Sequence, residues 1–465
     1  MPARFVNIDH DTPLLLPPDL RDWLPKDHLV HFIMDAVAQV DVGSAKVNHQ
    51  GTGSEQYPPS MMMGLLIFCY VTGNFSSRKI ERLTHESVAV RFLCADTHPD
   101  HDSICTFRRV NKALFTSLFH QVLEMAVRSQ VLHVGDITLS LDGTKIFANA
   151  SKHSAVSHGH IALQLKLLED QIGELIAKAE DADSTPLQDG LSIPAEIERR
   201  VDRIAKLKAA KAVIEERARE RIAKEKAEYE SKLAARAAQE ATTGKKPRGR
   251  APKAPSETPA PSDQMNFTDP ESRIMPVSGS KDFEQCYNAQ AGVEVQSRLI
   301  VAAAVVQAPN DKEQLAPGIG AVSPVISSIA NVLADSGYYS EAAVRQVEQN
   351  AEGKPTGTTV YAATKRTHHQ RSVRDLEQHD DPPVPSPEAS ASERMAQRTS
   401  TAAGRALYKL RQQTVEPVFG IIKSAMGFRS FSMRGLEKAE LEWTLVSASY
   451  NLKRLFNLKA QLKAA

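Results

Sequence analysis

Two carboxylates that follow short apolar strands are the residues of this chain best placed to do chemistry. Asp142 follows residues 137–141, where apolar and polar side chains alternate with the period of two expected for a half-buried strand. Asp335 follows a second apolar run, residues 331–334. A strand end can present a metal ligand, and Gly143 is then expected to be where the chain leaves the sheet. Asp-Gly is equally a common turn signal, so either stretch alone also fits a plain turn.

A third acid, Glu416, lies in a segment with helical periodicity, residues 411–423. The apolar residues of this segment that share one helical face are Val415, Phe419 and Ile422. This face predicts that the helix docks on the sheet, with Glu416 at its edge and able to reach the strand ends. Lys423 lies two turns farther along the same side, where it could hold a phosphate or a DNA end. Pro417 fits either a first helical turn or a kink.

Converging carboxylates repel one another unless a cation lies between them. Mg²⁺ prefers hard oxygen ligands, and two such ions about 4 Å apart can activate a nucleophile and stabilise the leaving oxygen of a phosphodiester. We therefore predict a metal centre held by Asp142, Asp335 and Glu416. With 56 acidic residues in the chain, some trio can always be assembled. This trio is favoured because each of its acids lies at the end or edge of a core element.

The elements that must position these acids follow a recognisable order. Strands are expected at 137–142, 287–295, 299–306, 331–335 and 358–363, with helices at 341–349 and over 402–462, the last broken near Gly427 and Gly435. Once residues 161–265 are set aside as an insertion, this order predicts an α/β fold with a ribonuclease-H-like mixed sheet flanked by helices. The first and fourth strands of that sheet are neighbours, which brings Asp142 and Asp335 together.

Residues 1–130 are expected to form an all-α N-terminal domain. Polar breaks at 74–77 and 98–102 separate short helices, with Ser76 or Ser77 and then Asp102 or Ser103 as expected N-caps. The second of these helices is expected to expose Thr106, Arg108, Arg109 and Lys112. A basic helix after a tight turn suits a helix-turn-helix-like unit that binds DNA, with Arg78, Arg108 and Arg109 as candidate contacts. Small helices that pack only on one another fit the pattern equally well.

The insertion, 161–264, reads as a helical hairpin followed by a linker. A heptad-like apolar stripe covers 161–179, a break covers 181–190, and a charged helix covers 194–239. A solvated arm is the favoured interpretation, with a partner-binding or DNA-binding arm as the alternative. The basic, Pro-rich stretch 243–263 is expected to be a disordered tether that could touch phosphates, and 377–401 a disordered loop. The catalytic domain is then 131–160 together with 265–465.

Composition sets outer limits on function. The 465 residues carry a formal net charge of +1, which counts only mildly against a polyanion partner because local patches can differ from the total. The four cysteines are scattered, so neither a disulfide framework nor a zinc ribbon is expected. The longest apolar run, residues 61–71, is too short to span a bilayer, and the N-terminus lacks the layout of a signal peptide. We expect a soluble, cytoplasmic protein without a membrane partner.

Five short motifs, in order, resemble the catalytic domain of bacterial insertion-sequence transposases of the DDE class. They are Leu-Asp142-Gly-Thr-Lys, Tyr287-Asn-Ala-Gln, Asn310-Asp, Ala-Asp335-Ser-Gly-Tyr and Val-Glu416-Pro-Val-Phe-Gly-Ile-Ile-Lys423. Phe431-Ser-Met-Arg434-Gly and Tyr450-Asn451-Leu are similar to the C-terminal helix signature of that family, and residues 78–109 to its helical N-terminal domain. The resemblance covers about 1–150 and 265–460 and omits the hairpin.

The resemblance implies cut-and-paste DNA transposition. Asp142, Asp335 and Glu416 would be ligands of Mg²⁺, with Mn²⁺ as a substitute ion, for a water-driven nick at the element end and attack by the 3′-hydroxyl on target DNA. It also implies double-stranded DNA partners, namely terminal inverted repeats and target DNA. A homodimer on paired ends and association with the nucleoid are further expectations.

Two departures from the family pattern concern individual residues. Tyr408, Arg411 and Lys423 match a helix signature that relatives often carry, but Glu416 lies one residue farther from Arg411 than that signature asks. The departure bears on the DNA-binding roles of Tyr408 and Arg411 more than on Glu416. Glu294 stands where relatives tend to carry Asp, and we expect it to be non-catalytic. Two other functions stay open: a catalytically idle DNA-binding repressor of the element, and a nuclease without strand transfer.

Overall fold

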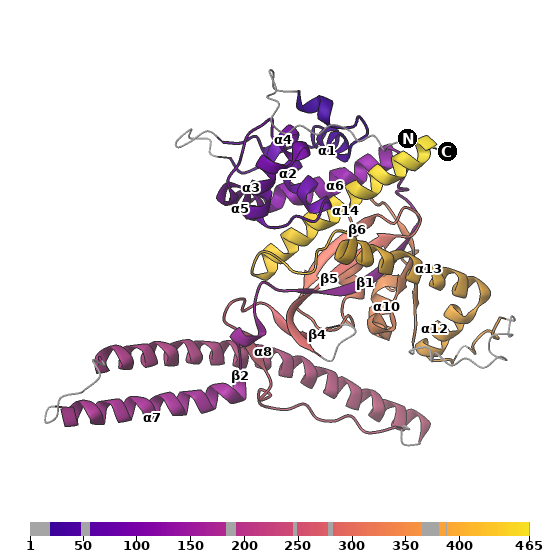
Figure 1. The fold of residues 1–465 in the computed structure, drawn as a ribbon. Coiled ribbons are helices and arrows are strands. Elements are labelled where there is room, and N and C mark those ends of the chain that lie inside the picture. Colours follow the sequence, from indigo (N-terminus) through magenta and orange to yellow (C-terminus); the bar gives the residue numbers. More distant parts are fainter. Residues whose placement is uncertain are drawn as a thin grey trace, which may run out of the picture.

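The computed structural model describes residues 19–47, 56–182, 192–244, 249–277, 282–364, 381–386 and 388–464. Several stretches with sequence predictions lie outside these residues: 1–18 and 48–55 of the N-terminal domain, 183–190 of the hairpin break, the basic run 245–248, and 377–380 and 387 of the predicted loop. The described chain has a helical part, a central sheet and a long two-helix arm (Figure 1).

The central sheet has the predicted ribonuclease-H-like order. Its strands are β1 (Ile137–Phe147), β4 (Arg273–Pro276), β5 (Phe283–Glu294), β6 (Ile300–Val306), β7 (Ile329–Ala334) and β8 (Thr359–Ala362). The order is β4-β5-β1-β7-β8, with β6 also paired to β5. β5 is antiparallel to β1 and β6, whereas β7 is parallel to both β1 and β8. The mixed α/β fold is confirmed, and the first and fourth strands of the predicted order are neighbours.

The prediction that β1 ends at Asp142 is wrong. The strand continues to Phe147 because its antiparallel partner β5 accompanies it, from Asp142 opposite Ala291 to Phe147 opposite Cys286. The parallel partner does stop here, since the last β1–β7 pair is Leu141 with Ala334. Asp142 thus lies where β1 loses one neighbour, and the chain does not leave the sheet at Gly143.

Helices cover the sheet and connect it to the N-terminal part. They are α9 (Leu315–Gly320), α10 (Glu341–Glu348), α12 (Ala391–Ser400), α13 (Ala402–Gly420) and α14 (Leu436–Ala464), with 3₁₀ turn η3 (Ser336–Tyr338) and π-helical turn η4 (Ile421–Ala425). α14 contacts β6 on one side and α2 and α6 on the other. Asn451 of α14 bonds both the amide and the carbonyl of Ile300, so its side chain satisfies the backbone of β6. Glu294, at the end of β5, accepts bonds from the amides of Gln296 and Ser297.

The N-terminal part is helical, as predicted. It comprises η1 (Leu20–Trp23), α1 (Leu29–Val37), α2 (Pro59–Val71), α3 (Ser77–Glu86), α4 (Val88–Leu93), α5 (His101–Val110) and α6 (Lys112–Arg128). Ser76 is the N-cap residue of α3, as predicted, but α5 is capped by Asp100, whose side chain accepts from the amide of Ser103, and not by Asp102 or Ser103. These helices and the sheet share one continuous hydrophobic core.

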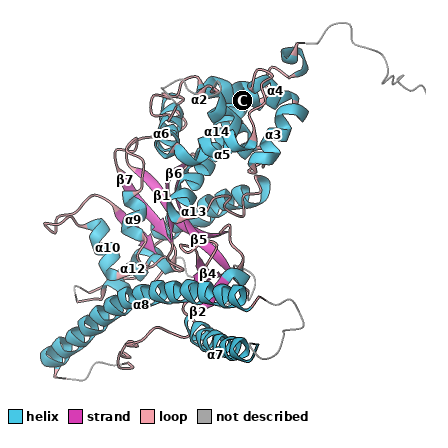
Figure 2. Ribbon diagram, turned by 90° about the vertical axis from the view of Figure 1, so that its left-hand side faces the viewer, coloured by secondary structure: helices cyan, strands magenta, loops and turns pink. Residues whose placement is uncertain are grey.

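The insertion forms an arm rooted beside the sheet. α7 (His158–Ala182) and α8 (Ile193–Thr243) pack through a small core of their own that includes Ile161, Leu168, Leu207 and Ile214. The strands β2 (Ala155–Ser157) and β3 (Gln264–Asn266) pair at the point where the chain enters and leaves the insertion. α8 runs past the base of the sheet and extends beyond it (Figure 2). The predicted hairpin is therefore present, and its second helix is much longer than its first.

Two segments predicted to be disordered contain ordered contacts. In 249–263, the carbonyls of Gly249 and Arg250 accept bonds from Arg236, and Asp263 forms a bidentate ion pair with Arg221. In 377–401, the last ten residues before Thr401 form α12. Its N-terminus is a capping box between Ser390 and Glu393, a stabilising signal that the surrounding Pro- and Ser-rich composition masks.

Candidate active site

The strand register places two of the predicted acids side by side. Leu141 and Ala334 are the last paired residues of β1 and β7, so Asp142 and Asp335 are the next residues of two neighbouring strands. The side chain of Asp142 is 20% exposed and that of Asp335 is 50% exposed. Asp142 accepts a hydrogen bond from the amide of Gly143 at 2.9 Å, and Asp335 accepts one from the amide of Ser336 at 2.7 Å.

Helix α13 delivers the third acid as the sequence predicts. Val415, Phe419 and Ile422 are buried, which docks this helix and the following π-helical turn on the sheet. Glu416 lies at the edge of this face with half of its side chain exposed. Pro417 lies inside α13 and not in its first turn. Because proline lacks an amide hydrogen, one helical bond is missing there, shortly before the helix widens into η4.

A single guanidinium brings the three acids together. Nη1 of Arg411 lies 3.5 Å from Oδ2 of Asp142, while its Nη2 lies 3.3 Å from Oε1 of Glu416 and 3.9 Å from Oδ1 of Asp335. Arg411 comes from α13, one and a half turns before Glu416, and its side chain is 11% exposed. The structure therefore gathers the predicted trio around one buried positive charge.

This cluster contains more acidic groups than basic ones. Burial raises the pKa of Asp142 to about 6, against the lowering effect of Arg411, with the neighbouring negative charges of Asp335 and Asp311 adding to the increase. Burial lowers the pKa of Arg411, but attraction by Tyr408 and the three acids outweighs it, so this pKa is raised overall. Three carboxylates share one cation, and the buried Nε of Arg411 has no partner among the described residues.

The donor set fits a divalent cation, although the described residues hold no preformed metal cluster of three or more acidic, His or Cys ligands. All three candidate donors are carboxylates, the hard oxygen ligands that Mg²⁺ and similar ions take. Arg411 lies between them, where it supplies part of the positive charge that the carboxylates need. Asp142, Asp335 and Glu416 are residues whose carboxylates could hold a metal ion here.

A fourth acid, Asp311, lies next to this cluster, although no sequence pattern predicts a role for it. Its Oδ1 accepts bonds from the side-chain amides of Asn288 at 2.8 Å and Gln290 at 2.7 Å. A Cβ on Gly143 would lie 2.7 Å from that oxygen, so only glycine lets β1 pass so close to it. The motifs Tyr287-Asn-Ala-Gln and Asn310-Asp contained these residues, but nothing in their spacing showed that they meet.

The remaining residues predicted to contact DNA in the catalytic domain, Tyr408 and Lys423, differ in position. Tyr408 lies on α13 beside Arg411, and burial raises the pKa of its hydroxyl. Lys423 lies in η4, where its Nζ donates to the carbonyl oxygen of Lys145 at 2.9 Å. Burial lowers the pKa of Lys423. Arg411 faces the acids and not open surface, which makes it part of the acid cluster.

The prediction that α5 exposes Arg108 is wrong. This side chain is 4% exposed and donates to the hydroxyl of Tyr70 and the carbonyl of Phe75, each at 2.8 Å. It lies 3.8 Å from the fully buried Glu442 of α14. Arg108 therefore connects the N-terminal helices to α14. Thr106 and Arg109 are exposed as predicted, and Arg78 of α3 is also exposed. Lys112 is not on α5 but begins α6, and it pairs with Glu440 of α14 at 2.8 Å.

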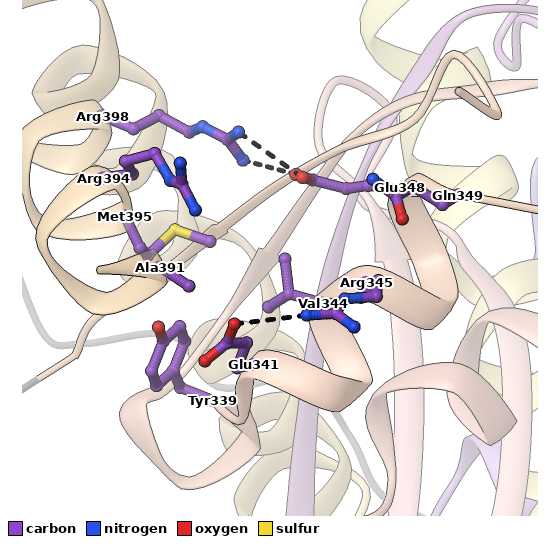
Figure 3. A pocket seen from close by; sticks show the side chains of 10 residues that line it. All are labelled: Tyr339, Glu341, Val344, Arg345, Glu348, Gln349, Ala391, Arg394, Met395 and Arg398. Atoms are coloured by element: carbon purple, nitrogen blue, oxygen red, sulfur yellow. Dashed lines mark hydrogen bonds and ion pairs between the residues drawn. The ribbon is translucent and has the colours of Figure 1, made fainter. Parts of the chain in front are cut away.

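A separate cavity of about 500 Å³ lies between α10 and α12. Figure 3 shows Arg394 and Arg398 reaching into it from α12, with Tyr339 and Glu341 on the opposite wall. Arg398 is paired with Glu348 of α10. This cavity is thus distinct from the carboxylate cluster.

None of the helices in the described part of the chain combines the length and hydrophobicity that a membrane crossing requires. Residues 384–456 match the family model "Transposase DDE domain", and residues 18–110 match "Transposase domain (DUF772)". The first match contains α12, α13 and Glu416, and the second contains the N-terminal helices through α5. No curated protein and no solved structure matches the chain significantly.

Proposed function

We propose that this chain is an insertion-sequence transposase of the DDE class, with Asp142, Asp335 and Glu416 as its catalytic carboxylates. With them the enzyme cuts DNA at the ends of the element and joins the 3′-hydroxyl ends to target DNA. The observation that carries this assignment is the convergence of the three acids, from β1, β7 and α13, on the guanidinium of Arg411. β1 and β7 lie outside both regions that match the family models, so the assignment of Asp142 and Asp335 is supported by the geometry of the structure alone.

The family generally uses divalent metal ions, and for this chain we propose Mg²⁺, with Mn²⁺ as a substitute. When bound, such ions supply an activated water nucleophile and stabilise the leaving oxygen of a phosphodiester. Asp142, the most buried of the three acids, must be ionised to serve as a ligand, and its pKa of about 6 sets the pH at which that occurs in the free protein. Arg411 neutralises part of the acid cluster, which keeps three carboxylates close together before any cation binds.

The DNA partners follow from the same assignment. We propose that the protein binds the terminal inverted repeats of its element and then target DNA, with Arg78 and Arg109 contacting phosphates from the exposed faces of α3 and α5. Lys423 contacts the strand near the acids. Arg108 takes no direct part, because it is buried. We further propose a homodimer on paired element ends, which the mass of the complex in sedimentation will test.

The test is cleavage of a labelled element end by the full chain in MgCl₂. The variants Asp142→Asn, Asp335→Asn and Glu416→Gln keep side-chain size and remove the charge. Each is expected to lose more than about a hundredfold in cleavage rate, a larger loss than typically follows removal of an outer-shell partner. Binding of the same DNA should persist. Glu341→Gln, an exposed acid of α10, is the matched control and should cleave normally.

Other outcomes identify other functions. Near-normal cleavage by any of the three variants would show that the site is assigned wrongly. Cleavage by the wild type without a joined product on added target DNA would indicate a nuclease. Tight binding of the ends with no cleavage by the wild type in Mg²⁺ or Mn²⁺ would indicate a repressor.

A further inference from the structure

The edge of β1 beyond Asp142 is covered by an unusual neighbour. β7 ends at Ala334, whereas β1 continues to Phe147, which leaves that part of the β1 edge without a parallel strand. The segment after α13 takes its place. The amide of Phe147 donates to the carbonyl of Arg429 at 3.0 Å, and the amide of Phe431 donates to the carbonyl of Phe147 at 2.9 Å.

This segment places cationic side chains one after another along β1. Lys423 bonds the carbonyl of Lys145, Arg429 is level with Phe147, and Nε of Arg434 donates to the carbonyl of Asn149 at 3.0 Å. At the rise of a β-strand, Lys145 and Phe147 lie about 10 and 17 Å from Asp142. We call Lys423, Arg429 and Arg434 the β1-edge row.

The row carries positive charge without a balancing acid. None of its members lies within 4 Å of a carboxylate in the described residues, and the bonds of Arg429 and Arg434 to carbonyls use only their Nε atoms. Arg429 and Arg434 are exposed, and Lys423 is half-buried. Burial lowers the pKa of Lys423, and the nearby positive charges of Arg429 and Lys145 lower it further. Fixed, uncompensated cations of this kind are typical of sites for phosphate groups.

We propose that the β1-edge row binds successive phosphates of the DNA strand that leaves the carboxylate cluster, so that the DNA runs along the C-terminal half of β1. At 3.4 Å of helix rise per nucleotide, 10 to 17 Å corresponds to about three to five nucleotides from the scissile phosphate. The chain continues from β1 to β2 at the root of the arm (Figure 1), so the DNA is directed toward α7 and α8. This inference rests on the proposed function, because Asp142 marks the point of cleavage.

The test measures binding of a fluorescent element-end duplex by the full chain over a range of salt concentrations. Arg429→Gln/Arg434→Gln should weaken binding about tenfold and reduce the slope of log affinity against log salt by about 2. Arg128→Gln/Arg345→Gln removes two exposed arginines elsewhere, on α6 and α10, and should leave affinity and slope unchanged. Arg429→Lys/Arg434→Lys keeps the charges and should bind nearly as the wild type. Wild-type affinity and slope in the glutamine variant, or equal loss in the lysine variant, would overturn the proposal.

Truncated duplexes test the direction of the DNA. When the duplex ends about two base pairs from the cleavage site on the side that the row contacts, the wild type and the glutamine variant should bind equally. Truncation on the other side should preserve their difference, and a difference that survives both truncations contradicts the proposed path. Since binding is the readout, Asp142→Asn separates the two ideas. Normal cleavage by Asp142→Asn would contradict the proposed function. The affinity and salt slope of Arg429→Gln/Arg434→Gln show separately whether the β1-edge row binds DNA.

Discussion

Two buried arginines, Arg108 in the N-terminal helices and Arg411 in the acid cluster, show how differently one side chain can be used. Arg108 has two hydrogen bonds of 2.8 Å, to Tyr70 and Phe75, and a carboxylate at 3.8 Å. The contacts of Arg411 with carboxylates are 3.3 to 3.9 Å long, but they reach three of these groups. Their exposed fractions are similar, 4% and 11%.

The two arginines differ in whether another cation could take their place. Arg108 is held by short, directional bonds to neutral groups, and Tyr70 in turn bonds Glu442, so removing it leaves several buried groups without a partner. Arg411 is held mainly by the surplus of negative charge around it, and another cation could supply the same attraction. Substitutions at Arg108, Arg411 and Asp142 test this contrast between a structural and an exchangeable cation.

The largest effect is expected at Arg108. Arg108→Leu should lower the free energy of unfolding by about 3–5 kcal/mol, because Glu442 stays buried without its charge partner. Arg109→Leu, the exposed neighbour on α5, is the control and should change stability by less than about 0.5 kcal/mol. Thermal and urea unfolding measure both. Equal stability of the two variants would mean that Arg108 is not the connection between α5 and α14.

A smaller effect on stability, which depends on whether divalent ions are present, is expected at Arg411. Without divalent ions, Arg411→Met should destabilise the protein by about 1–3 kcal/mol, because three carboxylates are then left without a counter-charge. Added MgCl₂ should raise the unfolding temperature of Arg411→Met more than that of the wild type, since Arg411 no longer competes for the acids. Lys409→Met, exposed on the same helix, is the control. Identical responses of all three proteins to MgCl₂ would contradict the idea of an exchangeable cation.

A third effect is a pH dependence at Asp142. Its pKa of about 6 in the folded protein exceeds the ordinary value of 3.8, so the folded state holds a proton that the unfolded state releases. Stability attributable to this group is therefore present below about pH 4 and is lost as the pH rises through 6, by at most about 3 kcal/mol. Asp142→Asn cannot titrate, so the metal-free variant should gain in unfolding temperature relative to the wild type between pH 4 and 7. A constant difference across that range would show that burial does not act on Asp142 in this way.

Sequence patterns were most reliable where one local signal decided the outcome. The helix predicted at 341–349 is present as α10, and Ser76 is the N-cap residue of α3, as predicted. Sequence patterns failed where a residue far away in the chain determines the length of a strand or the burial of a side chain. β1 was predicted to end at Asp142, but antiparallel pairing with β5 carries it on to Phe147. Arg108 was predicted to be exposed, because nothing near it in sequence shows that Tyr70 and Glu442 enclose it.

The sequence by itself determined the order of strands and helices, and hence which strands carry Asp142 and Asp335 and which helical face docks Glu416. Alternation and helical periodicity are local consequences of backbone geometry, so they can be read without the fold. Only the tertiary structure decided that Arg411 lies among the three acids, that Asp311 adjoins Gly143 and that Lys423, Arg429 and Arg434 follow the edge of β1 beyond Asp142. Those contacts join residues up to hundreds of positions apart. Their energies depend on burial and charge in three dimensions, which spacing along the chain does not encode.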